Sequence, residues 1–318
     1  MNAKLQILEL FGGIGAPRCA YRNLGIPVKS IDYVEIDEKA VRSYNAMFAS
    51  ELEYRAQDVR GWNLRPDVLV HGSPCQDFSI AGHQRGADEN SGTRSSLMWE
   101  TLRIIKNLGE WKPRVVIWEN VPNVLSKHMR HNFEKYLAQM RHIGYVNAVD
   151  TLNAMDFGLP QRRRRVFTVS ILHGRPFNFS TLTHRRMTPI RDLLETDVTA
   201  SQYVVRQPSM LKLIGKRGSK FNGYVPVITD VAQTITTAQM RCPNAGVIDT
   251  GRGYRYLTER ECWRLQGFTD QDFDAALQAN PGRPNRMNGI LYKQAGNSMP
   301  VPVLEAIFSQ LQDMKEVA

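Results

Sequence analysis

The sequence is poor in cysteine, with only four in 318 residues, at positions 19, 75, 242 and 262. None forms the CxxC pattern typical of zinc sites, and so small a number argues against a disulfide-stabilised scaffold. No apolar run approaches the roughly 20 residues needed to cross a bilayer, and residues 1–5 lack the layout of a signal peptide. We therefore expect no metal site, no membrane association and a cytoplasmic chain whose thiols stay reduced.

Acidic residues are scarce relative to basic ones: 31 Asp and Glu stand against 41 Lys and Arg, which gives a net charge of +10. Such an excess favours a polyanionic partner, because cations that neutralise phosphates release condensed counterions. A basic solvated surface is the alternative. The distribution favours nucleic acid, because the basic clusters lie mostly in the second half of the chain, at 162–165, 185–186, 212–220 and 252–264.

The first 172 residues alternate apolar runs with stretches of helical periodicity. Strands are predicted at 5–11, 30–34, 68–71, 115–118 and 166–171, and helices from Ala16 onward and at 38–48, 96–108 and 133–143. Such alternation is typical of a parallel sheet with helices on both faces.

Beyond residue 172 this alternation stops. Short β-branched runs at 224–228 and 231–237 lie among Gly, Pro and basic residues, and helices are predicted only at 259–265 and 302–314. The second half therefore predicts a smaller, irregular and mostly β region.

A glycine-containing loop separates the first predicted strand from the first helix. Gly13 and Gly15 stand where a loop at a helix N-terminus brings its backbone close to a ligand. Glu35 ends the second strand, where an acid commonly binds ribose hydroxyls, and Asp58 is placed to accept from an adenine amino group. The third glycine of a dinucleotide motif is replaced by Arg18, so a plain tight turn is the alternative. Together these residues favour an adenosine-bearing cofactor.

Two residues with catalytic chemistry follow buried strands. Cys75 comes after the run 68–70, and Glu119 ends the run 115–118. Open α/β sheets place such strand ends around one pocket, where a thiol serves as nucleophile and a carboxyl as proton donor. A buried apolar cysteine and a structural salt bridge are the alternatives.

Two further motifs stand near the ends of predicted elements. In Gln161–Phe167, Arg163 and Arg165 share one face of a strand, although a solvated basic edge has the same pattern. Gln294–Ser298 precedes the last helix and by itself offers only helix-capping side chains.

Taken in order, these motifs resemble those of the cytosine-5 DNA methyltransferases, in a compact prokaryotic or phage form. Only about 180–250 lacks a strong match, as expected of a variable target-recognition region. The resemblance rests on six blocks in the family's order: Phe11–Gly15, Pro74–Gln76, Glu119–Val121, Gln161–Arg165, Leu257–Phe268 and Gln294–Val303.

The resemblance implies an α/β fold, with a Rossmann-like S-adenosylmethionine-dependent methyltransferase sheet and a smaller, mostly β target-recognition domain. The catalytic and cofactor-binding domain would comprise residues 1–172, completed by 288–318, and the recognition domain residues 173–287. The implied partner is double-stranded DNA, bound by a monomer in the cytoplasm or at the nucleoid. A restriction endonuclease would act on the same site without forming a stable complex.

The implied reaction transfers a methyl group from S-adenosyl-L-methionine to C5 of a flipped-out cytosine and leaves S-adenosyl-L-homocysteine. Cys75 would add to C6, Glu119 would hold or protonate N3, and Arg165 with Arg163 would orient the base. Ile36 stands where some members stack an aromatic residue on adenine. The cofactor contacts implied are Phe11, Gly13, Gly15, Glu35, Ile36, Asp58, Asn297 and Ser298.

The resemblance also implies DNA contacts, which come from two parts of the chain. A loop of about 76–92 would close over the flipped base, with Gln84 and Arg85 near the emptied space. The other DNA-binding residues expected are Gln161, Lys212, Lys216, Arg217, Thr234 and Arg241.

Three other functions compete with this interpretation. An RNA cytosine-5 methyltransferase shares the catalytic blocks, but its Cys-Phe-Thr tripeptide is missing from the variable region. A DNA-binding protein without catalysis would not need Cys75, Glu119 and Arg165 together. A cysteine hydrolase would need a histidine base for Cys75, and no histidine has an evident role of this kind.

Overall fold

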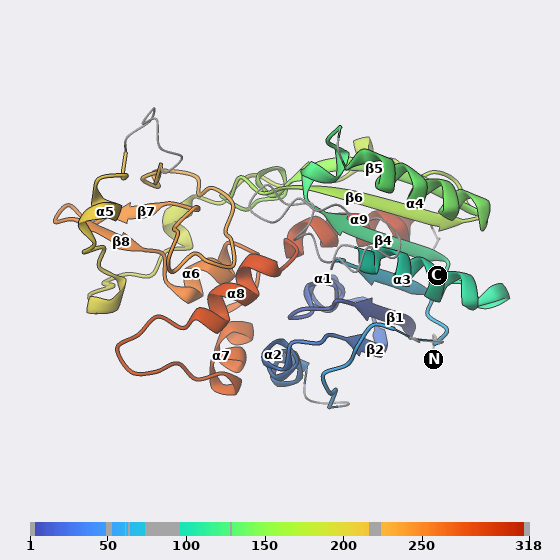
Figure 1. Ribbon diagram of the computed structural model, residues 1–318, viewed down its shortest axis with the longest axis horizontal. Coiled ribbons are helices and arrows are strands. Elements are labelled where there is room, and N and C mark those ends of the chain that lie inside the picture. Colours follow the sequence, from blue (N-terminus) through green and yellow to red (C-terminus); the bar gives the residue numbers. More distant parts are fainter. Residues whose placement is uncertain are drawn as a thin grey trace.

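A six-stranded mixed sheet forms the larger part of the protein (Figure 1). The structure is a computed structural model that describes residues 4–48, 53–60, 62, 64–73, 96–127, 129–215 and 224–314. In spatial order the strands are β2 (Val28–Val34), β1 (Leu5–Leu10), β3 (Val68–His71), β4 (Val115–Asn120), β6 (Arg164–Leu172) and β5 (Tyr145–Asn153).

The sheet is parallel only over its first four strands. β6 runs antiparallel to β4 and to β5, so the prediction of a wholly parallel sheet is wrong at this edge. The reason is the short connection 154–163 between β5 and β6, which is too short for the helical crossover that parallel neighbours need. The sequence pattern did not predict β5, because its exposed and half-buried residues do not form an apolar run.

Helices cover both faces of the sheet, as predicted. Alternate residues of each strand enter different cores: Val115 and Ile117 pack on one face, and Val116 and Trp118 on the other. The first face is covered by α1 (Ala16–Asn23), α2 (Glu38–Phe48) and α9 (Val301–Asp313), and the second by α3 (Leu97–Asn107) and α4 (Arg130–His142).

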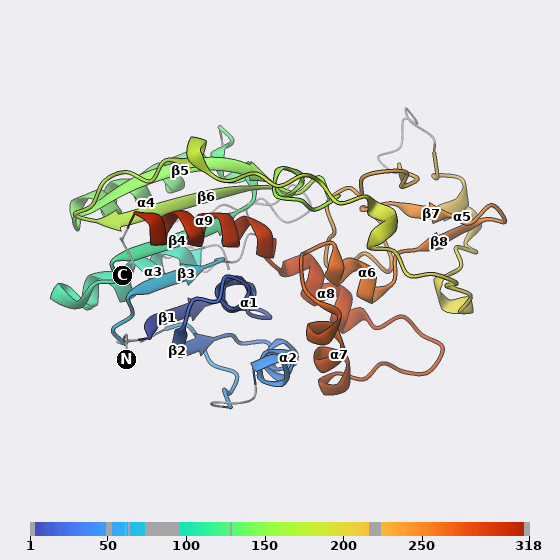
Figure 2. The ribbon, with the colours of Figure 1, turned by 180° about the vertical axis from the view of Figure 1, so that it is seen from behind.

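The last helix returns to the beginning of the chain. α9 lies along α1, where the rings of Tyr21 and Phe308 stack with centroids 3.9 Å apart, and Figure 2 shows it in front of the sheet. Glu305 of α9 also accepts a hydrogen bond from Asn23. The C-terminal segment thus completes the core that the first strand begins. None of the described helices is long and apolar enough to cross a membrane.

A separate small core lies at the far end of the molecule from the sheet (Figure 1). It gathers side chains around α5 (Pro208–Leu211), β7 (Val247–Asp249) and β8 (Tyr254–Tyr256). The predicted runs 224–228 and 231–237 form only isolated bridges, at Val225, Val227 and Ala232. Regular strand structure in the described part of this region is therefore sparse.

Both ends of the predicted recognition domain, 173–287, pack on the larger core. Phe177 and Phe179 belong to the main core, and the side chain of Gln310 on α9 donates to the carbonyl of Asn178. At the other end α7 (Asp270–Ala279) packs on α2, and Asp272 pairs with Arg22 at 2.8 Å. The separate core comprises residues between about 205 and 256.

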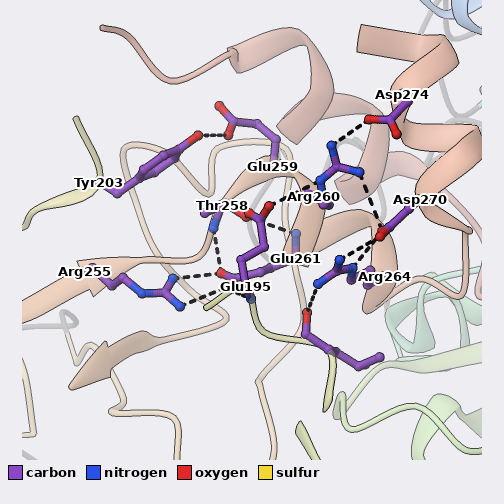
Figure 3. A network of polar contacts seen from close by, with 11 residues as sticks. Glu195, Tyr203, Arg255, Thr258, Glu259, Arg260, Glu261, Arg264, Asp270 and Asp274 are labelled. Carbon is purple, nitrogen blue, oxygen red and sulfur yellow. Dashed lines mark hydrogen bonds and ion pairs between the residues drawn. The ribbon is translucent and has the colours of Figure 1, made fainter. Parts of the chain in front are cut away.

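Ion pairs join this small core to α6 (Glu259–Arg264) and α7 (Figure 3). The fully buried Glu261 caps α6 through the backbone of Thr258 and pairs with Arg255 of β8 at 2.8 Å. Arg260 reaches Asp274 of α7 at 2.6 Å. The buried Glu261 carboxylate has both a cation and backbone donors as partners. These contacts fix the position of α6 relative to β8.

Candidate active site

The carboxyl ends of β1, β3 and β4 meet at one edge of the sheet, as parallel strands require. Gly72 follows β3, and a Cβ placed on it would lie 3.8 Å from Oε2 of Glu119 and 2.9 Å from Cε of Met299. The chain that leads into Cys75 therefore starts beside Glu119. Cys75 itself lies outside the described residues.

Glu119 and Arg165 form an ion pair at this edge. Arg165 Nε lies 3.1 Å from Glu119 Oε1, and each side chain is only 13% exposed. The antiparallel pairing of β4 with β6 places the two residues together, because it sets Asn120 opposite Val166. Burial raises the pKa of the Glu119 carboxyl above its ordinary value, and the guanidiniums of Arg165 and Arg163 offset only part of that rise.

Arg163 has a different environment, although it lies only two residues away. Its buried guanidinium donates to the carbonyls of Ile235 at 3.0 Å, Gly296 at 3.0 Å and Ser298 at 2.7 Å. Three main-chain acceptors from two distant segments thus meet on one side chain. This geometry suits a residue that positions backbone around the site, and the predicted part of Arg163 in orienting the base stays a prediction.

Gln161 is also in the interior. Its Nε2 donates to the carbonyl of Leu265 at 2.7 Å, and its Oε1 accepts from the amide of Ile235 at 3.0 Å. The side chain is fully buried and both of its polar atoms are bonded within the protein, and the contact of Gln161 with DNA stays a prediction. Gln161 and Arg163 thus form one buried junction, in which both side chains bond to the main chain of Ile235.

The other predicted DNA-binding residues are less constrained. Thr234 is half-buried, and its hydroxyl donates to the carbonyl of Arg162 at 2.7 Å. Lys212 and Arg241 are exposed. The remaining four lie outside the described residues: Gln84, Arg85, Lys216 and Arg217.

The loop after β1 has the backbone conformation expected of a close ligand approach. Gly13 has φ +56°, and a Cβ on it would meet none of the described atoms within 4 Å. A Cβ on Gly15 would instead lie 2.6 Å from the ring of Tyr44, so only glycine fits there. Phe11 also has positive φ, at 54°, which is uncommon for a bulky residue and often marks a functional turn.

Glu35 lies against this loop. Its carboxylate accepts from the amides of Gly13 at 3.0 Å and Asp37 at 2.9 Å, which orients it at the end of β2. The next residue, Ile36, is a large apolar side chain that is 71% exposed. Asp58 is also exposed and bonded to Arg60, which lowers the pKa of its carboxyl to about 2.

The segment with Asn297 and Ser298 is brought to the same side. It ends α8 (Gly289–Asn297), which is joined to the region after β2 by the Lys293–Asp37 ion pair at 2.6 Å. Asn297 is exposed, and Ser298 is buried. A glycine loop, two carboxylates and an exposed apolar side chain together fit an adenosine-bearing cofactor, because hydroxyl and amino groups need acceptors and the base needs apolar cover.

Glu9, which the sequence pattern did not single out, contacts the glycine loop indirectly, through Tyr44. It is fully buried in β1, accepts from the hydroxyl of Tyr44 at 2.6 Å, and burial raises the pKa of its carboxyl to about 7. Tyr44 in turn crowds Gly15. The available signal was a charged residue within an otherwise apolar strand, since such a residue needs a buried partner.

This fold and site define a class: a Rossmann-like methyltransferase, with a glycine loop after the first strand and a carboxyl at the end of the fourth. The model of the C-5 cytosine-specific DNA methylase family matches residues 5–313. The chain belongs to this family, and it is a DNA (cytosine-5-)-methyltransferase. Family membership implies the use of S-adenosylmethionine.

Two named relatives agree with this assignment, and a solved structure shares the fold. The type II methyltransferase M2.ScrFI of Lactococcus lactis subsp. cremoris is 31% identical, over 96% of this chain and 99% of the relative. The type II methyltransferase M.Bsp6I of Bacillus sp. is 33% identical, over 95% and 97%. The S. pombe Dnmt2 methyltransferase structure has the same fold, with a TM-score of 0.75 at 19% identity over 98% of this chain and 99% of that one.

Proposed function

We propose that the protein methylates C5 of a flipped-out cytosine within a specific duplex DNA sequence, with Cys75 as the nucleophile and Glu119 as the acid at N3. The observation that carries this proposal is the buried Glu119–Arg165 pair beside Gly72, from which the chain runs directly to Cys75. Extruding the base is required because the target carbon is inaccessible inside a duplex.

The nucleophile makes the ring reactive. The Cys75 thiolate adds to C6, which breaks the aromaticity of cytosine and leaves nucleophilic character on C5. Glu119 holds or protonates N3, so that negative charge does not accumulate on the ring. A raised pKa suits this role, because it keeps more of the carboxyl protonated near neutral pH. Arg165 orients the carboxyl and lies close enough to it to face the O2 side of the base.

The bound cofactor, S-adenosyl-L-methionine, supplies an electrophilic methyl group and leaves as S-adenosyl-L-homocysteine. Glu35 would accept from its ribose hydroxyls, Asp58 from its adenine amino group, and Ile36 would cover the adenine face. The Phe11–Gly15 loop and the Asn297–Ser298 segment would hold the amino-acid end. After transfer, loss of the C5 proton and elimination of Cys75 free the methylated base and restore the enzyme.

We assign Arg163 a positioning role in this reaction. Its three carbonyl bonds join Ile235, in the segment proposed to read DNA, to Gly296 and Ser298, in the segment proposed to hold the cofactor. A substitution there would move both segments relative to Glu119. The catalytic role predicted for Arg163 then acts through backbone geometry.

The biological role proposed is protection of DNA from a restriction endonuclease that recognises the same sequence. The type II methyltransferases among the relatives support this. The enzyme would act as a monomer on cytoplasmic or nucleoid DNA, with no stable complex with the nuclease. The domain division proposed keeps residues 1–172 and 288–318 as the catalytic part and 173–287 as the part that recognises the target.

Bisulfite sequencing tests the proposal. Unmethylated plasmid is incubated with the protein and S-adenosylmethionine, and Cys75→Ser serves as the control. We expect cytosines in one short sequence to resist conversion, and the variant to leave none protected. Protection by the variant would remove Cys75 as nucleophile. No protection by cofactor-binding wild-type protein, with methylation of tRNA instead, would establish an RNA substrate.

A further inference from the structure

Residues 161–165 show a strict alternation between interior and exterior. Gln161 and Arg163 are buried, Arg165 faces Glu119, and the intervening Arg162 and Arg164 are exposed. Extended chain has this two-residue period, so Arg162 and Arg164 point away from the buried junction that Gln161 and Arg163 form. The reaction proposed above uses the inward set and leaves the outward arginines without a role.

The outward arginines line a groove of about 600 Å³. Its walls come from both parts of the molecule: Asn153 and Met155 at the end of β5, and Gln233 and Thr234 from the segment proposed to read DNA. Arg165, which pairs with Glu119, also lines the groove. A nucleic-acid strand whose base reached Glu119 would therefore pass its backbone along this groove.

The charge of the groove is unbalanced. Arg165 has Glu119 as a partner, but among the described residues neither Arg162 nor Arg164 has a carboxylate within ion-pair distance, and no acidic residue lines the groove. Two adjacent guanidiniums repel each other in the free protein, and anions relieve that repulsion. A guanidinium also matches a phosphodiester oxygen pair in shape, through two parallel hydrogen bonds.

We propose that Arg162 and Arg164 bind the phosphates next to the target cytosine, on the strand that carries it. This proposal rests on the proposed function and adds the path of that strand. Thr234 supports the path, because its hydroxyl bond to the carbonyl of Arg162 fixes that arginine to the recognition segment. Phosphate contacts of this kind position the duplex and carry no sequence information.

Binding measurements over a range of salt concentrations test the proposal. Arg162→Gln, Arg164→Gln and the double variant are compared with Arg141→Gln, which changes an exposed arginine on α4 that has no described ion pair. Fluorescence anisotropy would give the affinity for a methylatable duplex and for a scrambled duplex of equal length. Thermal melting and cofactor affinity would show that each variant is folded.

We expect each groove variant to weaken both duplexes by about tenfold, and the slope of log K against log salt to fall by about 1 per arginine. Arg141→Gln should change neither quantity. An unchanged salt slope would overturn the proposal. A loss confined to the methylatable duplex would overturn it too, because the arginines would then read base edges.

Uncharged methylphosphonate linkages locate the contact. Methylphosphonates in place of the phosphates that flank the target cytosine should weaken binding by the wild-type protein. The same change in the DNA should weaken binding by Arg162→Gln and Arg164→Gln little further, because the contact is already missing. If the protein variant and the methylphosphonate change weaken binding independently, so that their losses of binding free energy add, the arginines do not contact these phosphates. The two proposals fail separately: absence of methylation on any DNA contradicts the proposed function, whereas active enzyme with additive losses contradicts only the strand path.

Discussion

Arg165 and Arg163, two neighbouring arginines of the active-site region, have opposite environments. At the end of β4, Arg165 faces a carboxylate that is partly accessible, with the side chains 13% exposed. At the junction behind it, Arg163 is 2% exposed and donates to main-chain carbonyls of Ile235, Gly296 and Ser298. The first arrangement leaves groups that a substrate can displace, and the second does not. The proposed chemical role of Arg165 and the scaffolding contacts of Arg163 are thus only two residues apart in the chain.

The largest expected effect is on the chemical side of this comparison. Glu119→Gln keeps the shape of the side chain but cannot give a proton to N3. We expect single-turnover methyl transfer to slow by about 10²- to 10⁴-fold, the usual contribution of a positioned acid. Cofactor affinity and thermal stability should stay close to wild type. A normal single-turnover rate would show that another group protonates the base.

The second prediction compares the loss of Arg163 with the loss of Arg165. Arg163→Met leaves three buried carbonyls without their donor, and we expect it to reduce the free energy of unfolding by at least about 3 kcal/mol. Arg165→Met should destabilise less, because Glu119 can neutralise itself by binding a proton, yet it should slow transfer. Urea unfolding and single-turnover rates on both variants measure this. Equal destabilisation by the two substitutions would contradict the division.

A third effect tests how tightly the junction is packed. A Cβ on Gly296 would lie 2.4 Å from backbone atoms of Thr236 and Thr237, so Gly296→Ala must move one segment. We expect a loss of about 1–3 kcal/mol in stability, together with weaker binding of DNA and cofactor. Gly282→Ala is the matched control, because its nearest neighbour would be 3.4 Å away. No change in either affinity would show that the two segments are not coupled through Gly296.

The smallest expected effect is the pH dependence of the single-turnover rate. The pKa of Glu119 is raised, so the protonated form persists above the ordinary range of a carboxyl and is lost as pH rises through the folded value. If the protonated form is active, the single-turnover rate should decline by at most about tenfold per pH unit above that pKa. Glu119→Gln should lack this decline. A rate that rises over the same range would indicate that the ionised carboxylate is the working form.

Patterns that depend on local sequence predicted much of the fold. The helix 38–48 and the strand 68–71 have the predicted bounds, because strong apolar periodicity and short buried runs are local signals. α7 and α8 were not predicted, since their apolar faces are short and pack on other helices. The runs 224–228 and 231–237 were predicted as β, but they meet too few partners to form more than bridges.

The sequence by itself determined the chemistry: the order of the motifs, the carboxyl at the end of an apolar run, and the family to which the chain belongs. Only the tertiary structure decided which of these side chains face the site. Gln161, Arg163 and Arg165 alternate with exposed arginines along one segment, yet the first two are buried among main-chain partners and the third meets Glu119. The difference depends on β6 running antiparallel to β4 and on segments more than 70 residues away that supply the partners. Periodicity is a local property, whereas the partner of a buried polar group is set by contacts across the whole chain.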